Sequence, residues 1–205
     1  MWILKLIVVA IAGYLLGNLN GAIIASKLRG DDVRSHGSGN AGLTNYIRSY
    51  GANHSFLVIL IDAGKGVLAC VLGGLLLKNH LGFTAGAAVG GTGVMLGHMF
   101  PVFFKFRGGK GILTGLFIAV VVDWRVAVLI LAVFAVLYFT TRYVSLSSVA
   151  ASLSFSAGFA IFHHRDLVTM CCGVFMGLMA VFMHRTNIAR LIKGQESKTD
   201  LFKKK

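Results

Sequence analysis

Residues 112–138, ILTGLFIAVVVDWRVAVLILAVFAVLY, form two apolar runs that are interrupted only by Asp123-Trp124-Arg125. Read as one segment, they would hold an aspartate and an arginine in mid-bilayer, at about 2.5–3.5 kcal/mol each. Read as two segments, Ile112–Val122 and Val126–Tyr138, they place the tripeptide in a turn. The second reading adds one membrane crossing and reverses the orientation of everything that follows.

The composition of the whole chain is that of a membrane protein. Of 205 residues, 56% are hydrophobic and 13% are charged, and the mean hydropathy is +0.78. Soluble domains carry about twice that share of charge, which excludes a water-soluble protein. Spans of about 20 residues leave room for seven helices and for no second domain. We therefore expect a single transmembrane domain, residues 1–205, with a basic tail from about residue 185 and with spans at Ile3–Ala25, Ser55–Leu77, Phe83–Phe104, Ile112–Val122, Val126–Tyr138, Val144–Phe162 and Leu167–Met183.

The distribution of Lys and Arg predicts the orientation. The formal net charge is +13, from 20 basic and 7 acidic residues. With seven spans and the N-terminus outside, fifteen of the twenty basic residues lie inside, including Lys203-Lys204-Lys205 in the tail, in agreement with the positive-inside rule. With six spans only eight lie inside. The sequence predicts an all-α bundle of seven transmembrane helices with a cytoplasmic C-terminus.

Small residues recur along the third span. Gly82, Gly86, Gly90, Gly93 and Gly97 are three or four residues apart, which strips one face of a helix of side chains. Such a face lets another helix backbone approach closely, so we interpret the pattern as helix packing.

The connection between residues 27 and 53 has the composition of an anion-binding loop. Glycines at positions 37, 39 and 42 let successive N–H groups turn toward one point, and Ser38, Asn40, Thr44 and Asn45 add donors. Arg48 adds a positive charge. The glycines spell G-x-G-x-x-G, but they follow a membrane span rather than a strand, which excludes a dinucleotide site. The alternative is a flexible polar loop.

A second basic, glycine-rich turn, residues 105–111, follows the third span. It lacks the first glycine and the Ser or Thr of a nucleotide-binding P-loop, so we interpret Lys110 as a phosphate clamp. A basic helix end at the membrane surface is the alternative. His98, just before this turn, is either a catalytic group or a side chain that satisfies a neighbour.

Asp62 and Lys65 lie inside the second span, three residues apart and so on one helix face. We interpret them as a mutually neutralised pair that holds helices together; a proton or ion path is the alternative.

Two further polar clusters, residues 142–148 and 184–196, are predicted at the same cytoplasmic face as the two glycine-rich loops. Groups from distant parts of the chain that meet on one face indicate a site better than any single motif. The histidines are too scattered for a metal site, even with Glu196 and Asp200 nearby.

These motifs resemble those of the bacterial acyl-phosphate:glycerol-3-phosphate acyltransferases, and the resemblance covers the whole chain. In chain order they are Gly37-Ser38-Gly39-Asn40 through Thr44-Asn45 and Arg48; Asp62-x-x-Lys65-Gly66; Gly97-His98-x-Phe100-Pro101 leading to Gly108-Gly109-Lys110-Gly111; Ser145-Leu146-x-Ser148; and His184-Arg185-x-Asn187-Ile188-x-Arg190-Leu191 with Gly194-x-Glu196. The departures are small: Leu43 stands where the family usually has Ala, and Gln195 where Thr is common.

The resemblance implies an enzyme of phospholipid synthesis in the bacterial inner membrane, with its active site at the cytoplasmic face. Such an enzyme transfers a fatty acyl group from acyl phosphate to the 1-hydroxyl of sn-glycerol 3-phosphate, giving lysophosphatidic acid and phosphate. It needs no cofactor or metal, and neither a nucleic acid nor an obligate protein partner is expected. Carried over by motif, the catalytic residues are Ser38, Lys110, His184 and Asn187, and the substrate-binding residues are Gly37, Gly39, Asn40, Thr44, Asn45, Arg48, Gly108, Gly109, Ser148 and Glu196.

Two questions stay open at the level of sequence. The group that accepts the hydroxyl proton is either His184 or a phosphate oxygen of the substrate. The competing function is a small transporter of a phosphorylated solute, but a carrier needs polar groups reaching both faces, and here they gather on one.

Overall fold

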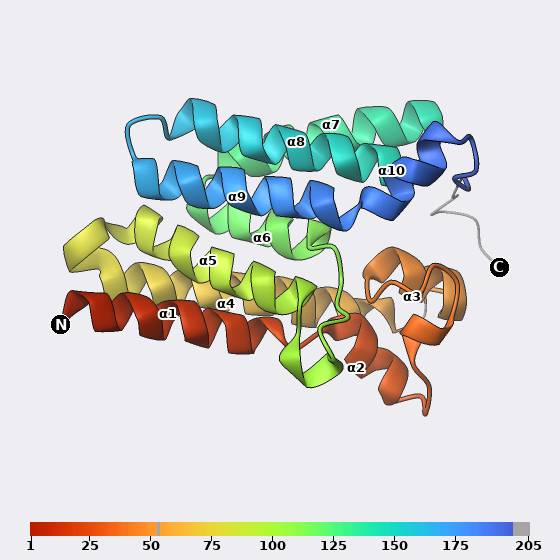
Figure 1. The fold of residues 1–205 in the computed structure, drawn as a ribbon, viewed down its shortest axis with the longest axis horizontal. Coiled ribbons are helices and arrows are strands. Elements are labelled where there is room, and N and C mark those ends of the chain that lie inside the picture. The colour runs from red at the N-terminus through yellow and green to blue at the C-terminus, as the bar shows by residue number, and fades with distance from the viewer. Residues whose placement is uncertain (53, 199–205) are drawn as a thin grey trace. The chain divides into compact units, whose positions relative to one another are not determined.

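The computed structural model describes residues 1–52 and 54–198. Asn53, Asp200 and the Lys203-Lys204-Lys205 tail lie outside the described residues. Within them the chain is helical and has no β-strand (Figure 1). It divides into two compact units, Met1–Val122 and Asp123–Lys205, which are described one at a time. The expectation of a single domain stays a prediction.

The described residues of the first unit form six α-helices and two short 3-10 helices. They are α1 (Trp2–Gly17), α2 (Gly21–Lys27), η1 (Val33–Ser35), α3 (Leu43–Tyr50), α4 (Ser55–Leu81), α5 (Phe83–Met99), η2 (Val102–Phe104) and α6 (Ile112–Val122). The second unit holds α7 (Trp124–Thr141), α8 (Val144–Phe162), α9 (Leu167–Met183) and α10 (Arg185–Ile192). Each of the seven predicted spans coincides with an apolar helix or, for the first and third, with a helix and the short helix after it.

The helices have the lengths and composition of membrane spans, but the number of spans is not confirmed. Five segments of the described chain are long and apolar enough to cross a bilayer, and α9 with α10, bent by 55°, would be a sixth. The remaining apolar helix, α6, has 11 residues and so measures about 16 Å, about half the ~30 Å of a hydrocarbon core. Seven spans and the orientation of the termini stay predictions.

The interruption at Asp123 is confirmed as a helix boundary. α6 ends at Val122, Asp123 is extended, and α7 begins at Trp124. The Asp123 carboxylate accepts a hydrogen bond from the Arg125 backbone N–H at 2.9 Å and so caps α7.

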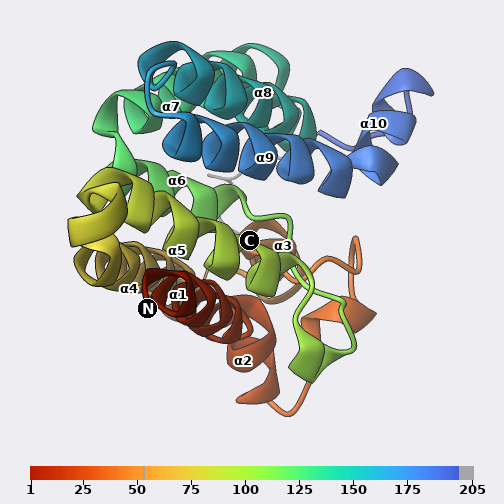
Figure 2. The same ribbon diagram turned by 60° about the vertical axis from the view of Figure 1, so that its left-hand side comes forward.

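Glycines explain why the helices of the first unit lie so close together. In Figures 1 and 2, α1, α4 and α5 run side by side. A Cβ at Gly90 would strike the Ala69 carbonyl of α4, and one at Gly97 would strike the Tyr14 carbonyl of α1. The predicted glycine packing is confirmed there. Gly82 is different: it has φ +82° and open space around it, so it ends α4 instead of packing.

In the second unit, α8 packs against both α7 and α9. Gly177 of α9 lies against α8, where a Cβ would meet Ser152 and Ser156, and the Ser156 hydroxyl donates to the Val174 carbonyl at 3.1 Å. At the α8–α9 turn, His163 Nε2 lies 2.9 Å from the Asp123 carboxylate and ties the turn to the start of α7.

Candidate active site

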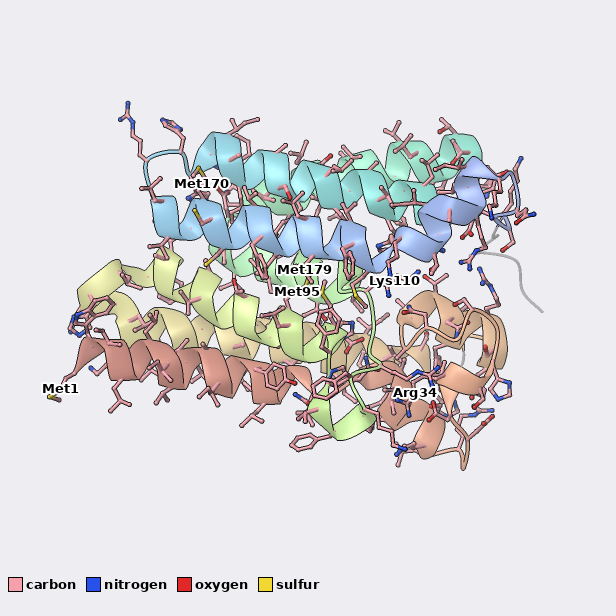
Figure 3. All side chains as sticks on the ribbon, viewed as in Figure 1. Met1, Arg34, Met95, Lys110, Met170 and Met179 are labelled. Atoms are coloured by element: carbon pink, nitrogen blue, oxygen red, sulfur yellow. The ribbon has the colours of Figure 1, made fainter. Side chains whose placement is uncertain are left out.

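The two glycine-rich loops of the first unit, residues 31–42 and 100–111, lie next to one another. The Arg34 guanidinium donates to the Phe104 carbonyl oxygen at 3.0 Å, and a Cβ at Gly109 would clash with the Ala41 carbonyl. Figure 3 shows Arg34 and Lys110 on this unit, away from the end that carries Met1. The structure therefore brings the Ser38 and Lys110 loops together, although about 70 residues separate them.

Arg34 is itself held in place by Asp32. The carboxylate accepts three hydrogen bonds from the guanidinium, at 3.0, 3.2 and 2.7 Å, and caps η1 through the Arg34 backbone N–H. The hydrogen bond from the Arg34 side chain lowers the pKa of Asp32 to about 2, although partial burial opposes this. The pair is ionised at neutral pH, which fixes the direction in which Arg34 reaches toward the other loop.

Asn45 organises the Ser38 loop. Its side chain is buried, and its Nδ2 lies 3.0 Å from each of three carbonyl oxygens, those of Val33, His36 and Asn40. Its Oδ1 accepts from the Ser38 backbone N–H at 2.9 Å. An amide with both hydrogens engaged has no donor for a ligand, so Asn45 positions the loop rather than binding substrate.

The loop glycines have a steric role. Gly37 and Gly39 have positive φ angles, +55° and +69°, and a Cβ on Gly37 would strike the Asn45 side chain. The N–H of Gly39 donates to the His36 carbonyl, as that of Ser38 does to Asn45. The predicted anion nest of backbone N–H groups is therefore not formed by these two residues. The Ser38 side chain is exposed at the tip of the loop.

The same holds for the glycines before Lys110. The N–H of Gly108 donates to the Met99 carbonyl at 3.2 Å, and that of Gly109 to the His98 carbonyl at 3.0 Å. A Cβ on either residue would clash with the end of α5. Both glycines are required because the backbone passes directly over α5, so they shape the turn and their N–H groups are unavailable to substrate.

The polar side chains expected around substrate lie on or beside these loops. Thr44 lies in the first turn of α3 and Arg48 in the last, where Arg48 is exposed; Asn40 and Lys110 are half-buried. The N-cap residue of α3 is Gly42, which has no side chain to cap the helix, so the first-turn N–H groups can bind water or an anion.

The second unit carries the other predicted site residues around α10. Glu196 accepts from the Asn187 amide at 2.8 Å and from Arg190 Nε at 2.6 Å. Burial alone would raise the pKa of Glu196, but the hydrogen bonds from Arg190 and Asn187 outweigh it and lower the pKa. Because both carboxylate oxygens are engaged, Glu196 orients Asn187 rather than binding an anionic substrate.

His184 lies at the bend between α9 and α10 and is buried. Its Nδ1 is 2.8 Å from the Ala180 carbonyl, which can only accept a hydrogen bond, so Nδ1 carries the proton. In the neutral ring, Nε2 is then the acceptor nitrogen. Ser148 is buried on α8, the helix against which α10 packs.

Comparison with known proteins identifies the family. A family model described as glycerol-3-phosphate acyltransferase matches residues 7–194. The chain belongs to this family. The glycerol-3-phosphate acyltransferase of Thermoanaerobacter sp. strain X514 is 39% identical over 193 residues, which cover 94% of each chain. That of Finegoldia magna is 37% identical over 196 residues, which cover 95% of this chain and 96% of the relative.

Two solved structures share the fold. The crystal structure of PlsY (YgiH), an integral membrane glycerol 3-phosphate acyltransferase, in its glycerol 3-phosphate form, matches with a TM-score of 0.85 and 32% identity, covering 97% of this chain and 99% of that one. The lysophosphatidic acid form of PlsY matches with a TM-score of 0.82 over 96% of each chain. The protein is thus an integral membrane acyltransferase, as the motifs indicated.

Three polar residues outside the sequence motifs also shape the site of this glycerol-3-phosphate acyltransferase. Arg34, Asn18 and Asn20 received no role, yet each bonds to the backbone of a distant loop: Asn18 accepts from the Phe103 N–H at 3.2 Å. For Asn18 and Asn20, the available signal was their polar character at the break between α1 and α2; Arg34 lies in η1 and had no such signal. Among the described residues no cluster of His, Cys, Asp and Glu could hold a metal ion.

Proposed function

We propose that this acyltransferase uses an acyl phosphate as donor and acylates the 1-hydroxyl of sn-glycerol 3-phosphate, releasing phosphate and lysophosphatidic acid. The observation that carries the proposal is the convergence of the Ser38 and Lys110 loops. Relatives crystallised in glycerol 3-phosphate and lysophosphatidic acid forms support the acceptor and the product.

The reaction needs little covalent help from the protein. The hydroxyl oxygen attacks the acyl carbonyl carbon, the bond from that carbon to the phosphate oxygen breaks, and the hydroxyl proton leaves to a base. Because the acyl phosphate is already activated, holding the two substrates close and stabilising the developing charge can supply the rate. A covalent acyl-enzyme is not required.

The positive charges of the first unit can stabilise two substrate phosphates that repel each other. Lys110 and Arg48 offset that repulsion, and Ser38 and Asn40 donate to the carbonyl oxygen or the leaving phosphate. Thr44 and the uncapped start of α3 provide further donors for phosphate. In this proposal Asn45, Gly108 and Gly109 hold the loops in shape.

The second unit supplies Ser148, Asn187 and His184, whose roles are carried over from the family motifs. The proton acceptor is either Nε2 of His184 or a phosphate oxygen of glycerol 3-phosphate. The Ala180 contact places the proton of the neutral ring on Nδ1, so Nε2 is the nitrogen that would take the hydroxyl proton in the first case. In this proposal the enzyme lies in the bacterial cytoplasmic membrane, with these groups on the cytoplasmic side.

The test is phosphate release by detergent-purified protein given palmitoyl phosphate, with and without sn-glycerol 3-phosphate. Release that requires both substrates, with 1-acylglycerol 3-phosphate on a lipid chromatogram, is the expected result. Activity with palmitoyl-CoA alone would show that the donor is a thioester. No activity with any donor in folded protein would favour the transporter alternative, which uptake by proteoliposomes would then examine.

A further inference from the structure

A buried charged cluster lies directly beneath the Lys110 loop. It consists of Asp62 and Lys65 of α4 and His98 of α5, all three less than 5% exposed. Lys65 Nζ lies 2.7 Å from Asp62 Oδ1, 2.7 Å from the Leu19 carbonyl and 2.8 Å from His98 Nδ1. An ammonium group has three hydrogens, and these three contacts match them; the Gly17 carbonyl is farther away, at 3.3 Å.

These three contacts of Lys65 determine which ring nitrogen of His98 carries the proton. Lys65 can only donate, so His98 Nδ1 accepts, and the proton of the neutral ring is on Nε2. Asp62 balances the charge of Lys65 and accepts from the Gly21 backbone N–H at 3.1 Å. Lys65 therefore sets both the tautomer and the orientation of the His98 ring.

The other side of that ring supports the loop. Nε2 of His98 lies against Gly109, where a Cβ would clash with it, and the His98 carbonyl accepts from the Gly109 N–H. The Ala41 carbonyl borders the same spot. The residue that follows is Lys110. The His98 ring therefore packs against the backbone immediately before the proposed phosphate-binding residue.

The cluster also reaches the Ser38 loop. Lys65 and Asp62 hold the break between α1 and α2 through the Leu19 carbonyl and the Gly21 N–H. Asn20, between these two positions, donates to the Ala41 carbonyl. A pair that only neutralised charge between helices would need no third member in contact with a loop.

We propose that Asp62, Lys65 and His98 are positioning residues that fix the Gly109–Lys110 backbone, and with it the placement of the substrate phosphate. The inference about substrate rests on the proposed function. The part about His98 does not, since its tautomer and its effect on the loop are measurable in protein without substrate.

The first experiment reads the tautomer. Nitrogen-15 NMR of histidine-labelled protein in detergent, with His98 assigned by loss of its signals in His98→Gln, should show a protonated Nε2 and an unprotonated Nδ1. In Asp62→Asn/Lys65→Gln, a neutral pair that keeps an acceptor for Gly21 and a donor for Leu19, the His98 pattern should change. A protonated Nδ1 in the wild-type protein would overturn the proposal, whatever the enzyme's substrate.

The second experiment compares two substitutions of His98. His98→Asn keeps an acceptor near the Nδ1 position for Lys65 but leaves the Gly109 side empty, whereas His98→Gln keeps an amide against Gly109 and lets Lys65 turn to the Gly17 carbonyl. We expect KM for glycerol 3-phosphate to rise roughly ten- to hundredfold in His98→Asn and much less in His98→Gln, with similar melting temperatures. If satisfying Lys65 were the only role, the order would be reversed, and that result would overturn the proposal.

The double variant Asp62→Asn/Lys65→Gln should also raise KM for glycerol 3-phosphate while its melting temperature stays close to that of the parent. A matched control is His163→Gln, which breaks the Asp123–His163 pair of the second unit. It should change the melting temperature and leave KM unaltered. A normal KM in the double variant would contradict the proposal, whereas an inactive wild-type enzyme would count against the proposed function alone.

Discussion

The guanidinium of Arg34 donates a hydrogen bond to the carbonyl oxygen of Phe104 at 3.0 Å, although the two residues are 70 positions apart in the chain. A second, longer contact at 3.4 Å reaches the Arg107 carbonyl. One side chain thus joins the loop that carries Ser38 to the loop that carries Lys110, and Asp32 holds that side chain in place.

Arg34→Lys should weaken this connection even though it preserves the charge. A lysine has no planar fork to bond Asp32 and the Phe104 carbonyl at the same time. We expect KM for glycerol 3-phosphate to rise about tenfold, since a charge-assisted hydrogen bond contributes about 1.5–3 kcal/mol when buried and less at this partly exposed site. Steady-state kinetics of the purified variant check this; an unchanged KM would show that the loops keep their spacing without Arg34.

Lys110→Ala should reduce turnover to a small residual rate while the protein still inserts normally. Loss of a cation that stabilises developing phosphate charge lowers kcat by about a hundred- to a thousandfold. Lys105→Ala is the matched control, because Lys105 is an exposed lysine of the same loop. Phosphate release and membrane yield are the measurements, and full activity in Lys110→Ala would remove the residue from the mechanism.

Asp62→Asn should cost stability more than substrate affinity when Lys65 is left intact. Removing one partner leaves a buried ammonium without its counter-charge, which typically destabilises a protein by about 3–5 kcal/mol. Thermal unfolding in detergent measures the effect. A melting temperature equal to that of the wild type would argue against a structural ion pair between these residues.

Gly97→Ala should destabilise the first unit, because its Cβ would strike the backbone of α1 at Tyr14 and Gly17. Overpacking of this kind costs about 1–3 kcal/mol. Gly64→Ala is the control, since nothing lies within 4 Å of a Cβ there, and in α4 the alanine should be neutral or stabilising by up to about 1 kcal/mol. Parallel melting curves of the two variants should therefore diverge; a shared shift would mean that α1 and α5 can separate without penalty.

The lowered pKa of Glu196 predicts how the stability of the folded protein depends on pH. Its pKa is lowered from 4.5 in the folded protein, so its stabilising contribution is complete above about 4.5 and is lost as pH falls through the lower, folded value. Between pH 5 and 8, Glu196 should add no pH dependence to stability. Glu196→Gln should lower stability at neutral pH, where it removes the charge that faces Arg190, and this deficit should shrink in acid; an equal deficit at all pH values would contradict the assignment.

The sequence by itself determined the membrane class, the positions of the apolar helices and the family. These follow from local composition: a run such as residues 167–183 is apolar in any context, and Asp123 is a helix boundary because mid-membrane charge is costly. Motifs such as Gly108-Gly109-Lys110 could also be recognised from the sequence, since their residue types and order are a property of the chain alone.

Only the tertiary structure decided what many of those residues do. Gly108 and Gly109 were expected to bind substrate, yet their N–H groups bond to the end of α5. Asn45 and Glu196 resembled ligands for substrate, yet their polar atoms are taken by neighbouring protein groups. A hydrogen-bond donor has the same sequence signature whether its partner is a ligand or a backbone carbonyl, and the partner is chosen by packing between distant segments. The link from Asp62 and Lys65 through His98 to Gly109 was invisible for the same reason, because it exists only where α4, α5 and the Lys110 loop meet.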